Sequence, residues 1–157
     1  MKNSAWAHAL LFLAYNADNK VVITKAGGIP PLVALVRDGT ALQKEHAAGA
    51  LWNLAGDTDN RVAIAQAGGI PPLVALVRDG NDDQKHSAAA ALRNLANSCA
   101  DNQILIAEAG GIPPLVALVR DGTDAQKKYA AVALQSLAFQ CADNEVLIAQ
   151  AKREAGI

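Results

Sequence analysis

The spacing of apolar positions changes along the chain in a fixed order, and each spacing predicts a different helix. Residues 32–36 are apolar at every position and follow Pro30-Pro31, which predicts a helix buried on most faces. Beyond Asp38-Gly39, apolar residues recur every three or four positions across residues 47–54. That spacing predicts a longer amphipathic helix with one core-facing stripe.

Short polar signals mark where the helices begin and end. The amphipathic helix starts at a capping box, formed by Thr40 with Gln43, by Asn81 with Gln84 and by Thr123 with Gln126. A shorter apolar segment precedes each buried helix, and we expect an aspartate to cap it, namely Asp18, Asp59, Asp101 or Asp143. A Gly-Gly pair should end it in the left-handed conformation. Its first copy, residues 21–23, is also compatible with a strand, but the alanine-rich later copies favour a helix.

These signals recur because the chain is internally repeated. Thirteen residues, GGIPPLVALVRDG, occur three times without change, starting at Gly27, Gly68 and Gly110, after intervals of 41 and 42 residues. A period of this size indicates a solenoid, in which one helical unit is stacked and equivalent side chains form rows. At 157 residues the chain is long enough for one such domain with a continuous core.

The repeat resembles the armadillo repeat in its period, in the order of short, buried and amphipathic helices, and in its glycine and proline positions. HEAT repeats are the nearest alternative, but their two-helix unit lacks the short first helix. The resemblance covers essentially the whole chain and implies an all-α fold, a right-handed α-solenoid with three helices per repeat of about 42 residues. The expected domain, 1–157, divides into a leading third helix (3–17), three repeats (18–58, 59–100 and 101–142) and a trailing first helix (143–157).

The resemblance also implies where a partner binds. In armadillo proteins the third helices line a concave groove for extended peptides, and asparagines clamp the peptide backbone because an amide side chain donates and accepts hydrogen bonds. That ladder position is held here by Asn53, Asn94 and Ser136. The residues expected to flank it or to form the groove floor are Trp52, Arg93, Gln135, His46, Ser87 and Tyr129. We therefore expect a non-enzymatic scaffold that binds an extended peptide or partner segment.

Two roles stay open for the ladder asparagines. Asn53 and Asn94 either clamp a peptide or hydrogen bond the neighbouring repeat and hold the stack together. Trp52 is either an aromatic anchor for a partner or a packing residue between helices. Family members that bind nuclear-import signals carry tryptophan and an acidic residue one and two turns earlier on this face. The first repeat has Gly49 and His46 there, so basic import signals are not the expected ligand.

Charge and cysteine content narrow the classes of partner. The 14 basic and 15 acidic residues give a net charge of −1, so nothing favours nucleic acid or an anionic membrane. No apolar run is long enough for direct membrane insertion.

Cys99 and Cys141 share one repeat position, and stacked helices lie roughly 8–10 Å apart, which is too far for a disulfide. We expect free thiols and an intracellular location, cytoplasmic or nuclear. The apolar start of the chain resembles part of a secretory signal, but residues 9–14 align with repeat material at 50–55.

We expect no enzymatic activity, no cofactor and no metal site. His8, His46 and His86 do not share a repeat position, and none is followed after three or four residues by a second ligand in a zinc pattern. The Gly-Gly pairs lack the lysine and the spacing of a phosphate-binding loop. Neither cysteine has a local base that would activate it.

The ends of the array lack the polar outer faces that a solenoid needs. The opening helix is apolar on all sides, and the residues expected to make contacts there are Trp6, Leu10, Leu11 and Phe12. At the other end, residues 151–156 replace the expected Gly-Gly-Ile-Pro-Pro, and a single short helix is expected over 144–151. Three explanations stay open: a fragment of a longer array, a homo-oligomer paired through its ends, or a consensus-like chain of near-identical repeats. The alternative function is accordingly a structural or assembly unit that self-associates through its ends without a dedicated ligand.

Overall fold

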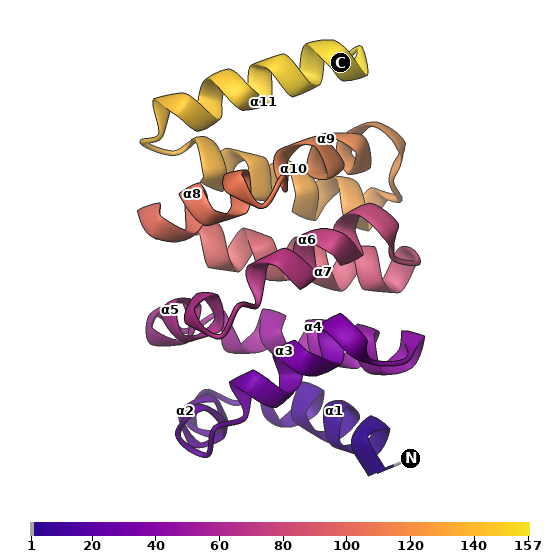
Figure 1. Ribbon diagram of the computed structural model, residues 1–157, viewed down its shortest axis with the longest axis vertical. Coiled ribbons are helices and arrows are strands. Elements are labelled where there is room, and N and C mark those ends of the chain that lie inside the picture. Colours follow the sequence, from indigo (N-terminus) through magenta and orange to yellow (C-terminus); the bar gives the residue numbers. More distant parts are fainter. Residues whose placement is uncertain (1) are drawn as a thin grey trace.

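The chain folds into helices joined by short turns (Figure 1). Within residues 2–157, which the computed structural model describes with side chains from Ala5 onward, there are eleven helices and no strand. The first helices of the three repeats are α2 (Ala17–Lys25), α5 (Thr58–Gln66) and α8 (Ala100–Glu108). The second helices are α3 (Ile29–Asp38), α6 (Ile70–Asp79) and α9 (Ile112–Asp121). The third helices are α1 (Lys2–Leu13), α4 (Ala41–Leu54), α7 (Asp82–Ala96) and α10 (Asp124–Ala138), and α11 (Ala142–Ala155) comes last.

The helices form layers that run the length of the array. The third helices pack in the order α1, α4, α7 and α10, each against its predecessor, and the second helices α3, α6 and α9 pack against them. The short first helices lie at one edge, where each leads the chain into the next repeat (Figure 1). Repeats thus pile up in register from the indigo N-terminus to the yellow C-terminus, which confirms the predicted helical solenoid.

No single helix in the described range is long and apolar enough to cross a bilayer. One pair, α8 and α9 with a bend of 82° between them, has the length and apolar composition to do so only in combination.

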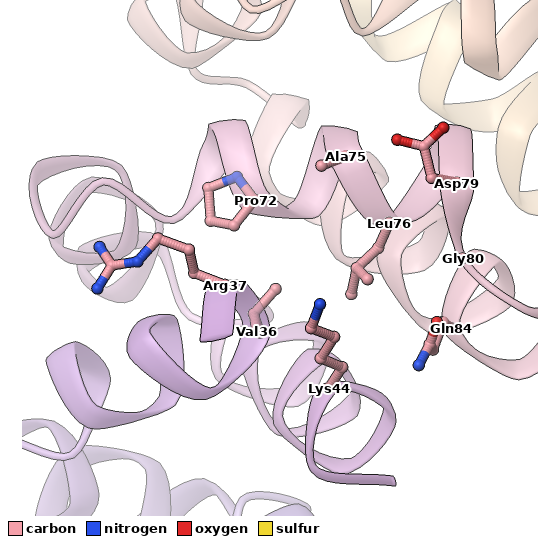
Figure 2. A pocket seen from close by; sticks show the side chains of 9 residues that line it. All are labelled: Val36, Arg37, Lys44, Pro72, Ala75, Leu76, Asp79, Gly80 and Gln84. Carbon is pink, nitrogen blue, oxygen red and sulfur yellow. The ribbon is translucent and has the colours of Figure 1, made fainter. Parts of the chain in front are cut away.

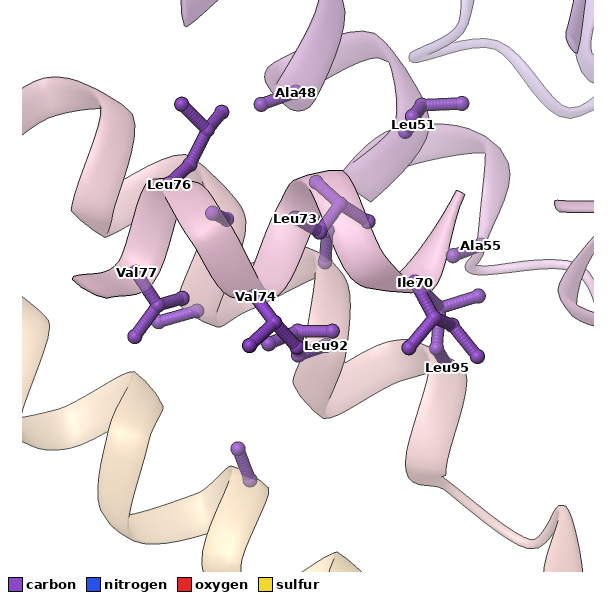
Figure 3. Close-up of a cluster of buried hydrophobic side chains, with 14 of the residues drawn as sticks. Ala48, Leu51, Ala55, Ile70, Leu73, Val74, Leu76, Val77, Leu92 and Leu95 are labelled. Carbon is purple, nitrogen blue, oxygen red and sulfur yellow. The ribbon is translucent and has the colours of Figure 1, made fainter. Parts of the chain in front are cut away.

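A continuous apolar core lies between the second and third helices. Leu73 and Val74 of α6 pack among Leu92 and Leu95 of α7 and Leu51 of α4, and all five are at most 3% exposed (Figure 3). The second helices are buried on most faces, as their uninterrupted apolar sequence predicts. The third helices contribute mainly alanine to the core, and small side chains at a helix contact allow close approach of the axes.

The predicted caps are confirmed in the third helices but not in the first helices. In α4, α7 and α10 the capping box is complete. In α4 the Thr40 hydroxyl oxygen accepts a hydrogen bond from the backbone N–H of Gln43, and the side-chain oxygen of Gln43 accepts one from the backbone N–H of Thr40. The prediction that Asp18 and its equivalents cap the first helices is wrong. Asn16 caps α2 and Asp57 caps α5, while the aspartates lie in the first turn, where their charge favours the positive helix end.

The interval of 41 and then 42 residues has a structural cause. The third helix α4 has 14 residues, whereas α7 and α10 have 15. After each longer helix the backbone adopts the left-handed conformation at one residue, Ser98 (φ 54°) or Gln140 (φ 56°). Cys99 or Cys141 then occupies the N-cap position of the next helix but makes no side-chain cap hydrogen bond, and both cysteines are free thiols. The additional residue therefore lengthens the third helix at the expense of the following cap.

Left-handed glycines end the first helices, and their absence changes the last helix. The first glycine of each pair has a φ of 74°, at Gly27, Gly68 and Gly110. Lys152 takes the equivalent position in α11, so this helix runs on and ends at Gly156, whose φ is 75°. The expected short helix over 144–151 is therefore wrong. Instead, α11 lies across α9 and α10 and covers them, and Arg120 Nη1 donates to the Ala155 carbonyl at 3.1 Å (Figure 1).

Replacement of Gly68 tests the conformational role of these glycines. A Cβ there would meet no heavy atom within 4 Å, so any cost comes from the backbone alone. We expect Gly68→Ala to lower the free energy of unfolding by about 1–2 kcal/mol. Gly68→Asn should lower it less, because asparagine tolerates the left-handed conformation. Denaturant unfolding followed by circular dichroism measures both, and equal stability of the two variants and the parent chain would contradict the assignment.

Candidate binding groove

The nine predicted groove residues lie on three neighbouring third helices. They are His46, Trp52 and Asn53 on α4, Ser87, Arg93 and Asn94 on α7, and Tyr129, Gln135 and Ser136 on α10. Eight of them are half-buried, and Gln135 is exposed. Because α4 packs on α7 and α7 packs on α10, these side chains form a surface row and do not belong to the core.

Three rings from successive third helices meet on this surface. The centroid of the Trp52 ring on α4 lies 5.3 Å from that of Tyr129 on α10 and 5.7 Å from that of His86 on α7, and His86 lies 5.0 Å from Tyr129. Neighbouring helices are spaced by roughly 8–10 Å, so side chains of α4 and α10 meet across α7 only on a face that curves inward. The contact therefore identifies the concave face. Trp52, His86 and Tyr129 are called the aromatic cluster below.

The ladder asparagines hydrogen bond the preceding repeat. Asn53 Nδ2 donates to the carbonyl oxygen of Leu11 in α1 at 2.9 Å, and Asn94 Nδ2 donates to that of Trp52 in α4 at 3.1 Å. Both acceptors lie in the last turn of a helix, where carbonyl groups have no partner within the helix. Each asparagine therefore holds the stack, and the bond uses one donor of an amide that has two donors and an acceptor oxygen.

Ser136 interrupts this ladder. Among the described residues, its side chain makes no hydrogen bond to α7, because a hydroxyl group reaches less far than an amide. A hollow of about 240 Å³ lies beside it, lined by Asn97, Ser98, Val132, Gln135, Ser136 and Phe139. The third repeat thus has a small cavity between the end of α7 and α10, next to the ladder position.

Polar side chains of the first helices form a second set of hydrogen bonds between helices, which sequence reasoning missed. Asn102 Nδ2 donates to the carbonyls of Leu95 at 3.0 Å and Arg61 at 3.3 Å. Gln103 Nε2 donates to the carbonyls at the ends of α7 and α10, at 3.2 and 2.9 Å. Arg61, which occupies the position of Gln103 one repeat earlier, bridges the ends of α4 and α7 in the same way. The sequence signal was an asparagine followed by a second polar residue in the first turn of the short helix, Asn60-Arg61 and Asn102-Gln103.

His8 and His46 meet at the other end of the row. His8 Nδ1 lies 3.3 Å from His46 Nε2, and the Phe12 ring packs edge-on against His8 at a centroid distance of 4.9 Å. His46 Nδ1 is buried and makes no hydrogen bond in the described part of the chain. Sequence reasoning predicted neither this pair nor the place of His86 in the aromatic cluster, because these contacts join different positions of successive repeats.

Leu11 occupies the space near the position where import-type armadillo grooves carry tryptophan. A Cβ on Gly49 would lie 2.7 Å from Leu11 Cδ1, so a larger residue does not fit at position 49 without a shift. Leu10 and Leu11 are half-buried and pack against the core, so Leu11 faces α4 and not the end of the array. Of the four predicted end residues, Trp6 and Phe12 are exposed, at 61% and 64%.

Two equivalent hollows lie where the second helices end, away from this row. The first, about 210 Å³, is lined by Val36, Arg37, Lys44, Pro72, Ala75, Leu76, Asp79, Gly80 and Gln84 (Figure 2). The second, about 250 Å³, repeats it one unit later. The Arg78 guanidinium hydrogen bonds the Asp79 carboxylate and holds the pKa of Asp79 below its usual value. Charges of both signs surround each hollow, which therefore favours neither an anion nor a cation.

Comparison with known families settles the fold family. The model of the armadillo/beta-catenin-like repeat matches residues 16–56, 57–97 and 99–139. The chain belongs to the armadillo repeat family. Each matched armadillo unit runs from a first helix to the following third helix, and α1 and α11 lie outside the three units. A comparison with curated protein sequences finds no match.

Solved armadillo structures resemble the chain over most of its length. A computationally designed armadillo repeat protein for modular peptide recognition is 27% identical, with a TM-score of 0.86, over 91% of this chain and 61% of that one. An engineered protein is 31% identical, with a TM-score of 0.88, over 94% and 61%. A designed armadillo repeat protein in complex with the peptide (KR)4 is 26% identical, with a TM-score of 0.82, over 91% and 61%. The chain thus spans about 61% of the length of these structures, and the likeness supports the consensus-like interpretation of its repeats.

Exchange of the ladder residues tests whether they hold the armadillo stack. Asn94→Ser removes the bond to the Trp52 carbonyl, and Ser136→Asn supplies an equivalent donor toward the end of α7. We expect the first to lower the free energy of unfolding by about 0.5–1.5 kcal/mol and the second to raise it by a similar amount. Denaturant unfolding measures both, with Gln135→Asn, at an exposed neighbouring position, as the control. Unchanged stability in both variants would mean that these amides contribute nothing to the stack.

Proposed function

We propose that the chain is a non-enzymatic binding scaffold whose concave surface holds an extended peptide or partner segment. The observation that carries the proposal is the aromatic cluster. Trp52, His86 and Tyr129 are half-buried side chains from three successive helices, gathered at one place on the concave face. Large rings at the centre of a surface are typical anchors of protein interfaces, because they desolvate a large apolar area with few rotatable bonds.

The ladder asparagines support the same proposal, because each can hydrogen bond the preceding repeat and a peptide at the same time. The bonds to Leu11 and Trp52 use an amide N–H of Asn53 and of Asn94 and fix the orientation of each side chain. The amide oxygen is an acceptor for the backbone N–H of a bound peptide. The two roles that the sequence left open are therefore compatible, and the stack bond orients the clamp in advance.

The ligand should be uncharged or acidic and should carry at least one large apolar side chain. A designed armadillo neighbour was solved with the peptide (KR)4. Of the nine groove residues of this chain, however, Arg93 is the one with a permanent charge, and it would repel such a peptide. An extended segment rises about 3.3 Å per residue, so roughly six to ten residues would cover the row. We further propose an intracellular location, in keeping with the two free thiols.

Selection from an unbiased peptide display library tests the proposal. The affinity of a selected peptide, labelled and followed by fluorescence polarisation, should fall at least tenfold in Trp52→Ala, because a central aromatic anchor typically contributes about 2 kcal/mol or more. The double variant Asn53→Ala/Asn94→Ala tests the ladder separately, at a temperature at which circular dichroism shows it to be folded. The peptide (KR)4 should bind more weakly than the selected one.

Glu108→Ala on α8 is the matched control, because Glu108 is exposed on a first helix and away from the row. It should leave the affinity unchanged. The groove is not the binding site if the folded Trp52→Ala and double-alanine variants both retain the parent affinity. A library that yields no binder to the parent chain would contradict the proposed function itself.

A second candidate function, assembly through the α1 end, rests on a separate observation. Trp6 and the α3 residues Pro31, Ala34 and Leu35 line an apolar hollow of about 350 Å³. The equivalent residues of α6 face the preceding second helix α3, and Leu76, the equivalent of Leu35, is only 5% exposed. In the interior repeats a neighbouring second helix covers the leucine of this surface, and we propose that a second copy of the chain supplies a helix here.

Trp6→Glu tests this assembly. If copies pair over the hollow, light scattering over a concentration series should show association of the parent chain and a monomer for the variant, since a carboxylate in an apolar contact is costly. Val62→Glu on α5 removes another exposed apolar side chain, 46% exposed against 61% for Trp6, and is the control because it lies away from the hollow. A parent chain that stays monomeric at every concentration would exclude this function.

A further inference from the structure

Two histidines from neighbouring third helices bring ring nitrogens together at the start of the concave row. His8 on α1 and His46 on α4 are 38 positions apart in the sequence, yet His8 Nδ1 lies 3.3 Å from His46 Nε2. Their rings are inclined by 62°, with centroids 4.6 Å apart, so they meet through their edges and do not stack flat. The Phe12 ring packs edge-on against His8, at a centroid distance of 4.9 Å. Two potential ligands are thus already positioned.

The separation of the two nitrogens matches the bite of a tetrahedral metal ion. Imidazole nitrogens bind zinc at about 2.0–2.1 Å, so two of them on one tetrahedral ion are about 3.3 Å apart. Two neighbouring nitrogens of a square-planar site at the same bond length would be about 2.9 Å apart. We propose that His8 Nδ1 and His46 Nε2 form an open site for a divalent transition-metal ion, and that zinc is the ion that fits it best.

The protons of the two rings can be placed to leave both facing nitrogens free. In the metal-free chain one facing nitrogen carries the proton of the hydrogen bond, and a metal requires that proton on the opposite nitrogen of the same ring. His46 Nδ1 has no hydrogen-bond partner, so no neighbouring group opposes the tautomer that carries the proton there, and that tautomer buries an N–H without an acceptor. His8 is exposed, so water can hydrate its second nitrogen.

The site has two protein ligands, and water completes the coordination shell. Within the described residues, no group of three or more histidine, cysteine, aspartate or glutamate side chains is close enough to hold a metal ion. The sequence argument against a metal site considered ligands three or four residues apart on one helix. It does not apply to His8 and His46, because they come from α1 and α4. A bound ion would link these two helices directly.

Isothermal titration of the tag-free chain with zinc chloride tests the site, since an appended histidine tag would itself bind zinc. We expect one zinc ion per chain. His8→Ala and His46→Gln should each weaken binding at least about tenfold, because even the loss of a residue behind a metal ligand costs 10–100-fold. His86→Ala removes the third histidine but neither ligand and should keep the parent affinity. The double variant Cys99→Ser/Cys141→Ser should keep it too.

A second readout separates coordination from an indirect effect on folding. Nitrogen-15 spectra of the imidazole rings should show zinc-dependent shifts at His8 Nδ1 and His46 Nε2 and none at His86. Zinc should also raise the unfolding temperature of the parent chain and not that of His8→Ala, because a ligand stabilises only the state that binds it. The site is disproved if the parent chain binds no zinc, if His8→Ala binds it with unchanged affinity, or if only the cysteine variant loses binding.

Discussion

Every third helix of this array ends in carbonyl groups that its own backbone cannot satisfy, and the stack depends on donors for them. A carbonyl buried between repeats without a partner costs about 1–3 kcal/mol. Side chains of the same or the next repeat supply the donors: Asn53 and Asn94 donate to the preceding third helix, Asn102 donates to the end of α7, and Gln103 donates to the end of α10. At the opposite end of the third helices, the capping-box residue Gln84 donates across the stack to α4 at 2.8 Å. Apolar burial brings the helices together, and these directional bonds fix their register.

Local signals were enough to predict the helices, and contacts between repeats were not predictable. The capping boxes, the prolines and the glycine pairs act within a few residues, so the order and the ends of most helices follow from the sequence. The capping role given to Asp18 failed because Asn16, two positions earlier, offers the same chemistry at the point where the backbone is still extended. The row of groove residues followed from the resemblance to armadillo repeats. His86 and the pair of His8 and His46 did not, because they join different positions of successive repeats, and the curvature that brings them together is a property of the folded array.

The repeats divide their residues between two tasks. The thirteen identical residues form the second helices and their turns, where Leu32, Leu73 and Leu115 have the same buried environment in every unit. The groove floor differs in each unit, with His46 on α4 and Tyr129 on α10 at equivalent positions. A shared core lets any unit stack on any other, so the surface residues can vary without a change of packing partners. Such a division suits a scaffold whose specificity is set one repeat at a time.

Stacking and recognition are nevertheless coupled on the concave face. The amide of Asn94 that would present its oxygen to a ligand is held in place by the carbonyl of Trp52, and Trp52 is itself a member of the aromatic cluster. Contact between Trp52 and Tyr129 spans two repeat interfaces, so a small straightening of the array would separate the rings while every helix stayed intact. A loss of curvature should therefore abolish binding before it causes any loss of helix content, and a bound segment that touches both rings would in turn stabilise the curved form. The proposed binding surface is thus a property of at least three repeats acting together, and no single armadillo unit of this chain contains it.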